Sequence, residues 1–219
     1  MEPRLTPRRP HDRAAPETSS RDKILDVAEA LFAQRGFSGV GLREVADAVG
    51  LGKSSLFHHF RSKVDLYLEV LGRVLARIDE RVQPVQAAAL PPFDKLDRWI
   101  EALVDVLAEQ PATARLLLRG LFEDDAIPAD AGPEAAAAER RIESLIHGVG
   151  SILREGIEQG VFRTVSVAHT IQTLIGATVY HFASGEFGEG LIGSALLSGE
   201  EVRRRKDHLK ALLHHGLAA

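Results

Sequence analysis

The spacing of apolar residues predicts helices along most of the chain. Between residues 20 and 35, apolar side chains recur at steps of three and four, which places them on one face of a helix: Ile24, Val27, Ala28, Leu31 and Phe32. The same spacing predicts a long helix from Val64 to about Val82, and further helices over residues 93–110, 111–123, 134–159, 166–183 and 200–215. No sustained alternation of apolar and polar residues predicts a strand, so we expect an all-α fold.

Helix ends are marked by caps, prolines and glycines. Pro84, followed by Pro91 and Pro92, is expected to end the long helix and to mark a linker. The glycine-rich residues 184–199 predict a connection rather than a helix. Two capping boxes predict helix starts: Ser19 with Asp22, and Ser198 with Glu201.

Residues 42–63, LREVADAVGLGKSSLFHHFRSK, predict two short helices around a turn. The first runs from Leu42 to Val49 and ends at Gly50, because glycine adopts the left-handed conformation without steric cost. The second runs from about Lys53 to Phe60 and leaves small, cationic and hydrogen-bonding side chains outside: Lys53, Ser54, Ser55, His58 and His59. Such side chains suit a helix that enters the major groove of DNA. This arrangement is the helix-turn-helix signature, although it also fits an ordinary pair of packed helices.

Three segments together resemble the N-terminal domain of the tetracycline-repressor (TetR) family of transcriptional regulators. They are ILDVAEALFAQRGF, LREVADAVGLGKSSLFHHF and SKVDL, and the resemblance extends over residues 21–71. It implies a three-helix DNA-binding domain at residues 20–66, then a larger helical domain at residues 67–219 for effector binding and dimerisation. The implied function is a homodimeric, sequence-specific repressor that a small-molecule effector releases from an inverted-repeat operator in double-stranded DNA. The alternative is a helical DNA-binding regulator that acts as an activator or without an effector.

The resemblance also implies which residues contact DNA, and this chain departs from the family pattern at three of them. Gly41 stands where a capping Ser or Thr is usual, and Phe57 and His59 stand where tyrosine is common. A phenyl ring cannot bind a phosphate, whereas a histidine can, and does so more strongly when protonated. We therefore expect phosphate affinity to have moved to neighbouring cations. The expected DNA-binding residues are Gly41, Arg43, Lys53, Ser54, Ser55, Phe57, His58, His59 and Lys63.

The rear domain must hold both a dimer contact and an effector pocket. The helices at residues 166–183 and 200–215 are the dimer candidates, because in the resembling family the last two helices of each subunit form a four-helix bundle. Polar or aromatic residues in apolar helical surroundings are the pocket candidates, although each also fits a core or surface position. They predict a hydrophobic or amphipathic effector, or an acidic one if Arg119 faces inward: Trp99, Leu103, Arg119, Phe122, His147, Thr173 and Tyr180.

Composition and charge narrow the class of protein. Of the 219 residues 45% are hydrophobic and none is cysteine, which excludes disulfides and fits a cytoplasmic protein. No apolar run is long enough to cross a membrane. Residues 1–63 hold 11 Lys and Arg against 8 Asp and Glu, whereas the rest is acidic, so the basic end suits DNA. Residues 1–19, rich in arginine and proline, predict a disordered basic arm that is either inert or touches DNA.

Enzyme chemistry finds no support in the sequence. A helical enzyme or metal-binding bundle would need inward-facing Glu-x-x-His pairs, or a nucleophile with a base. The sequence contains no Glu-x-x-His, no Cys and no metal-spaced His/Asp cluster. The adjacent His58 and His59 diverge by about 100° on a helix, so they do not form a metal site without further ligands. We expect no catalytic site, no metal and no cofactor. An architectural DNA binder without a sensor is a further alternative, and it predicts no ligand effect on DNA binding.

Overall fold

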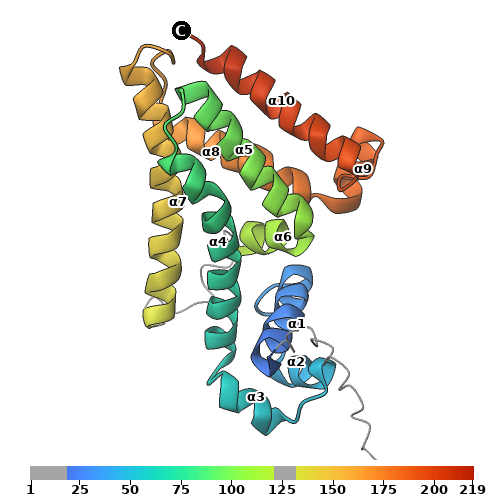
Figure 1. The fold of residues 1–219 in the computed structure, drawn as a ribbon. Coiled ribbons are helices and arrows are strands. Elements are labelled where there is room, and N and C mark those ends of the chain that lie inside the picture. The colour runs from blue at the N-terminus through green and yellow to red at the C-terminus, as the bar shows by residue number, and fades with distance from the viewer. Residues whose placement is uncertain (1–18, 121–131) are drawn as a thin grey trace, which may run out of the picture.

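The computed structural model describes residues 19–120 and 132–219, and within them the chain is helical with only one isolated β-bridge, between Phe162 and Ala218 (Figure 1). The arm was predicted over residues 1–19, and residues 1–18 of it lie outside the described residues. The helices are Ser20–Arg35 (α1), Leu42–Val49 (α2), Lys53–His59 (α3), Lys63–Ala87 (α4), Pro92–Glu109 (α5), Pro111–Gly120 (α6), Pro133–Glu158 (α7), Val167–Ala183 (α8), Gly185–Ile192 (α9) and Gly199–Leu217 (α10). None of these helices is long and apolar enough to cross a membrane.

Helices α1, α2 and α3 form a small head at one end of the molecule, and the C-terminus lies at the other end (Figure 1). Helix α4 starts in the head and continues into the rear domain, where it packs against α5 and α7. The boundary predicted between residues 66 and 67 therefore falls inside one continuous helix. Helix α6 lies between α1 and α8, and α10 packs along α5.

Caps and turns follow the local signals of the sequence. The Ser19 hydroxyl accepts a hydrogen bond from the Asp22 amide at 3.1 Å, and the Ser198 hydroxyl accepts one from the Glu201 amide at 3.2 Å. Gly50 has φ 74° and ψ 27°, the left-handed conformation that ends α2 and turns the chain toward α3. These local predictions are confirmed.

One predicted helix boundary was wrong. Pro84 does not end α4, which continues to Ala87 with the proline inside its last turn. A proline there removes one backbone hydrogen bond, at a cost of about 3 kcal/mol. Packing of the buried Ile78 and Val82 against the rear domain offsets that cost.

The glycine-rich residues 184–199 contain helix α9, which sequence analysis had assigned to a connection. Gly188 explains why a helix with three interior or terminal glycines can form here. A β-carbon at Gly188 would lie 2.0 Å from Ser184 Oγ and 3.0 Å from Leu196 Cδ1. The missing side chain lets the turn after α9 fold back on the helix, so tertiary packing overrides the weak helix propensity.

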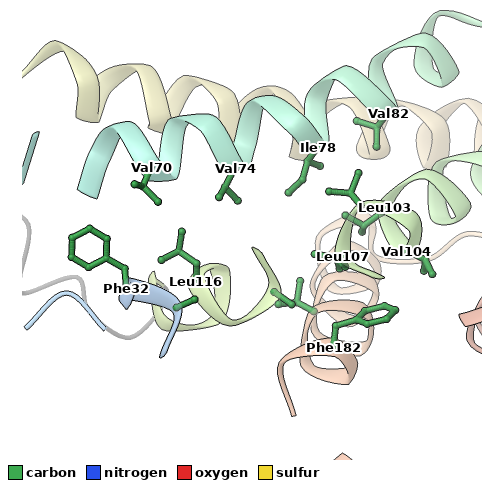
Figure 2. Packing of buried hydrophobic residues seen from close by; sticks show 14 of the residues in the cluster. Phe32, Val70, Val74, Ile78, Val82, Leu103, Val104, Leu107, Leu116 and Phe182 are labelled. Carbon is green, nitrogen blue, oxygen red and sulfur yellow. The ribbon is translucent and has the colours of Figure 1, made fainter. Parts of the chain in front are cut away.

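One apolar core runs from the head into the rear domain (Figure 2). Val70, Val74, Ile78 and Val82 form a stripe along α4, and all four are buried. Along this stripe lie first Phe32 of α1, then Leu116 of α6, then the side chains of α5, and Phe182 of α8 packs beneath α5; the buried α5 residues are Leu107, Leu103 and Val104. The head and the rear domain therefore share a single hydrophobic cluster.

A ladder of two ion pairs and one histidine–carboxylate hydrogen bond joins α5 to α10. The paired atoms lie 2.6–2.9 Å apart in three successive turns: Asp105 with Lys206, Glu101 with Lys210, and Asp97 with His214. The hydrogen bond to Glu101 raises the pKa of Lys210. The ladder holds α10 antiparallel to α5, which leaves the opposite side of α10 exposed.

Candidate nucleic-acid interface

Helices α2 and α3 turn apolar residues inward and polar residues outward. Val45 and Ala46 of α2 and Leu56 of α3 are fully or almost fully buried in the head. The Leu51 amide donates a 2.9 Å hydrogen bond to the Ala46 carbonyl, which fixes the turn between the two helices. The short α3 is therefore held by its inner face, and its outer face stays open.

The outer face of α3 carries the side chains that the sequence predicted for DNA reading. Ser54 and His58 are exposed, Phe57 is 39% exposed, and Ser55 and His59 are half-buried. Lys53 is the first residue of the helix. Ser54, Phe57 and His58 are spaced by three and four residues, so they share one side of the helix. This side can present a hydroxyl, an imidazole and an apolar ring to a groove.

Three further residues that were predicted to bind DNA flank α3. Gly41 is the N-cap of α2 and is exposed, with no side-chain cap bond and no atom within 4 Å of the β-carbon position. Arg43 is exposed, and its Nε lies 3.9 Å from Asp47 Oδ2. Lys63 opens α4, but its Nζ lies 4.4 Å from the centroid of the Phe37 ring and 3.5 Å from the Ser38 carbonyl oxygen. These contacts hold the Lys63 ammonium against the loop that precedes α2.

Arg21, which the sequence analysis did not single out, holds the C-terminal end of α3. Its Nη1 donates to the His59 carbonyl at 3.2 Å, and its guanidinium lies 4.8 Å from the centroid of the Phe60 ring. The same guanidinium forms a bidentate pair with Glu69 of α4, at 3.0 and 2.5 Å. Arg21 thus ties α1 to α3 and α4. The sequence offers no signal for it, because its partners follow 38 and 48 residues later.

A second set of arginines ties α1 to its neighbours. Arg35 pairs with Glu44 of α2, and Arg73 of α4 lies 2.7 Å from Asp26. Arg77 of α4 forms a bidentate pair with Glu29, whose side chain is almost fully buried. Arg119 of α6 donates to two carbonyls at the end of α1. The orientation of the head is therefore fixed by polar contacts as well as by the shared core.

The predicted pocket residues are not brought together within one chain. Trp99 and Leu103 are buried on α5, and Arg119 is engaged with α1. Phe122 lies outside the described residues. His147 on α7 and Thr173 and Tyr180 on α8 are exposed, because these helices turn their other faces toward the core. The pocket composition stays a prediction.

Two open grooves lie where the head meets the rear domain. The first encloses about 500 Å³ between α1, α6 and α9, and its lining includes Arg115, Leu118, Arg119 and Phe187. The second encloses about 370 Å³ between α1, α4 and α7, and its lining combines apolar and charged side chains: Leu25, Leu68, Ala76, Arg73, Arg141, Glu69 and Glu134. Each groove pairs arginines with an apolar wall. Within the described residues, no group of His, Asp and Glu side chains is arranged to hold a metal ion.

A buried polar cluster lies where α8 meets α10. His181 is 6% exposed, and its Nε2 has no hydrogen-bond partner among the described residues. Burial, and then the nearby Arg205 guanidinium, lower the pKa of His181 from 6.5 to about 4, although Glu201 acts in the opposite direction. Arg205 donates to the Ala177 carbonyl at 2.5 Å. The neutral imidazole is therefore the form that this packing favours.

Comparison with known proteins places this arrangement in a family. The model for bacterial regulatory proteins of the tetR family matches residues 24–70, and the model for a tetracyclin repressor-like C-terminal domain matches residues 92–212. The HTH-type transcriptional repressor KstR2 of Mycolicibacterium smegmatis is 30% identical over 154 residues, which are 68% of this chain and 73% of that protein.

Solved structures share the fold. The structure of the ketosteroid transcriptional regulator KstR2 of Mycobacterium tuberculosis superposes with a TM-score of 0.73 at 22% identity, over 92% of this chain and 96% of that chain. The structure of AibR in complex with isovaleryl coenzyme A and operator DNA gives a TM-score of 0.71 at 17% identity, over 89% of this chain and 97% of that chain. With its exposed α3, its capping turn and these matches, the chain belongs to the TetR family of helix-turn-helix transcriptional regulators.

Proposed function

We propose that this chain is a homodimeric repressor that binds an inverted-repeat operator through α3 and leaves it when a small molecule binds the rear domain. The observation that carries the proposal is the open outer face of α3, where Ser54, Phe57 and His58 are exposed. Helix α3 itself lies at the end of the molecule opposite the C-terminus (Figure 1). A helix of this kind places its side chains against base edges in the major groove. As a DNA-bound regulator the protein would act in the cytoplasm.

The proposed division of labour on DNA follows from side-chain chemistry. Ser54 and His58 offer hydrogen bonds to base edges, and the exposed Phe57 ring suits the methyl group of a thymine. Gly41 through its amide, and Arg43, Lys53, Ser55, His59 and Lys63 through their side chains, are assigned to backbone phosphates. Base contacts should set sequence preference, whereas phosphate contacts should set affinity and its salt dependence.

The dimer is proposed to form through α8 and α10. Tyr180 of α8 is 52% exposed and Leu212 of α10 is 54% exposed, an unusual cost for large side chains unless a second subunit covers them. We expect Leu212→Glu to give a monomer that binds a single half-site but loses the full operator, measured by light scattering and DNA titration. Ile146→Glu, which changes an exposed apolar residue on α7, is the control and should remain dimeric. A dimeric Leu212→Glu protein would move the interface elsewhere.

The effector is proposed to be a coenzyme A thioester with an apolar acyl group. AibR, which shares the fold, was solved with isovaleryl coenzyme A. In this chain, both grooves between head and rear domain combine arginines, which suit phosphates, with apolar walls, which suit an acyl chain. Isovaleryl coenzyme A should release the protein from operator DNA, whereas free coenzyme A and isovalerate should not. Release by all three, or by none, would contradict this effector class.

Footprinting on the DNA upstream of the protein's own gene, over a salt series, tests the DNA-binding proposal. We expect protection of an inverted repeat, with half-sites about one helical turn (~34 Å) apart. Failure to protect that DNA, followed by failure to select any site from genomic fragments, would contradict the proposal. A reporter joined to the site separates a repressor from an activator, because deleting the regulator raises expression only in the first case.

A further inference from the structure

Arg119 connects the rear domain to the end of α1. Its Nε donates to the Ala33 carbonyl at 3.1 Å, and its Nη2 donates to the Gln34 carbonyl at 2.9 Å. Both carbonyls belong to the last turn of α1, where no intrahelical donor is available and the helix dipole is negative. A cation from α6 therefore caps a helix of the DNA-reading head.

Arg77 makes a second connection among the same elements. Its guanidinium bonds to both carboxylate oxygens of Glu29 on α1 and, at 3.0 Å, to the Thr113 hydroxyl on α6. Glu29 is 5% exposed and Thr113 is fully buried. One side chain of α4 thus joins α1 to α6 inside the protein, where ion pairs are little screened by salt.

Apolar packing supports the polar contacts. Leu116 of α6 lies beside Phe32 of α1, and both face the Val70–Val82 stripe of α4 (Figure 2). Helix α6 also packs against α8, which is half of the proposed dimer surface. A continuous path of packed helices, α8 to α6 to α1, therefore leads from the subunit contact to the head.

We propose that Arg119 and Arg77 are positioning residues that fix the angle of the head on the rear domain, and with it the distance between the two α3 helices of a dimer. This inference rests on the proposed function, because the angle matters only if two heads read one operator.

The consequence for DNA binding is specific. The two recognition helices of a dimer must enter grooves about one turn (~34 Å) apart. If a head pivots, the dimer can bind one half-site but no longer fits the second at the same time. Loosening the connection should lower affinity for the best operator and widen the range of half-site spacings that are tolerated. Affinity for an isolated half-site should stay the same, because neither arginine belongs to the DNA-facing surface.

The test measures binding to one half-site duplex and to inverted repeats whose spacing differs from the best one by one or two base pairs in either direction. For Arg119→Ala we expect about a tenfold loss on the best spacing, a flatter spacing profile and an unchanged half-site affinity. Arg119→Lys, which keeps one charged donor group, should restore part of the preference for the best spacing. Arg98→Ala changes an exposed arginine of the neighbouring helix α5 that lines neither groove, and it should match the unmodified protein.

Removing Arg77 leaves Glu29 buried without its cation and can unfold the protein, so Thr113→Val is the milder second variant. It keeps the side-chain shape and removes the hydroxyl that Arg77 binds. It should reduce the difference in affinity between the best spacing and the other spacings by about twofold to threefold. If Arg119→Ala and Thr113→Val keep the profile of the unmodified protein, the inference is wrong. If the unmodified protein binds inverted repeats no better than the half-site, the proposed function itself fails.

A second measurement reports the geometry without DNA. The sequence contains no cysteine, so Ala48→Cys places one spin label on the exposed side of α2 in each subunit. The distance distribution between the two labels of a dimer should broaden when Arg119→Ala is added, and should not change when Arg98→Ala is added. Equal widths in all three proteins would contradict the positioning role.

Discussion

Single arginines hold the DNA-reading surface in place while remaining outside it. Arg21 is the clearest case, because one guanidinium contacts the end of α3, the ring of Phe60 and the carboxylate of Glu69. Its side chain is nearly half exposed, so its ion pair contributes little to global stability. Its effect should appear in the alignment of α3.

We predict that Arg21→Gln lowers operator affinity by about tenfold while changing the free energy of unfolding by less than about 1 kcal/mol. DNA titration and denaturant unfolding measure the two quantities. Lys23→Ala, an exposed change on the same turn of α1, is the matched control and should alter neither. Equal losses of operator affinity in the two variants would assign the effect to charge alone.

At Gly41 we predict a substitution that raises both stability and operator affinity. Its backbone is extended, with φ −103°, and the space at its β-carbon is open, so serine fits without strain. Gly41→Ser should raise the free energy of unfolding by a few tenths of a kcal/mol and operator affinity by about fivefold, because the hydroxyl caps α2 and reaches a phosphate. Gly41→Ala should instead cost about 1 kcal/mol of stability. A serine variant that behaves like the alanine variant would contradict the capping role.

Among the helices and turns, the connection from α7 to α8 depends on Gly156. The Gly156 carbonyl accepts from the amides of Val161 and Phe162, and a β-carbon there would lie 2.1 Å from the Phe162 ring. Phe162 is 2% exposed and packs edge-on against Phe93, so it cannot move aside.

Gly156→Ala should therefore lower the free energy of unfolding by about 1–3 kcal/mol. Gly72→Ala in the interior of α4, where no atom lies within 4 Å of the new methyl group, should be neutral or stabilising by up to about 1 kcal/mol. Denaturant unfolding of both proteins measures the difference. A loss of similar size at Gly72 would show that helix context, rather than the Phe162 ring, determines the cost.

The packing of α8 on α10 predicts a pH dependence. Because the pKa of His181 is about 4 in the folded chain and 6.5 in the unfolded chain, only the unfolded chain gains a proton as pH falls from 6.5 toward 4. The free energy of unfolding should fall over that window, by on the order of 2 kcal/mol from this residue, and be fully present above pH 6.5. His181→Leu should remove this part of the slope in unfolding curves measured from pH 4 to 7. An unchanged slope would assign the pH dependence to the carboxylates.

The sequence predicted correctly those features of the helices that depend on residues close together in the chain. The caps at Ser19, Gly50 and Ser198 and the inner face of α3 were confirmed, because each depends on residues a few positions apart. Helix α9 and the continuation of α4 past Pro84 were missed, because packing partners distant in sequence stabilise them. The arginine contacts of α1 were also missed, because their partners are distant in sequence. Thr173 and Tyr180 can face a cavity only if their side of α8 is buried. Which side of a helix is buried depends on how the whole chain packs, so the sequence alone did not predict it.

In the whole molecule, one cluster of buried side chains extends from Ile24 in the head to Leu209 in the last helix. Separate domains with separate cores would melt in two steps, each with its own heat absorption. Here the loss of Phe32 or Leu116 from the cluster destabilises the head and the rear domain together, because both pack against the same stripe of α4. Calorimetry should therefore record a single cooperative transition whose calorimetric and van't Hoff enthalpies agree, once the dimer equilibrium is included. A chain cut within α4 would then leave two fragments that are each unable to fold, so the DNA-reading head is not a portable module.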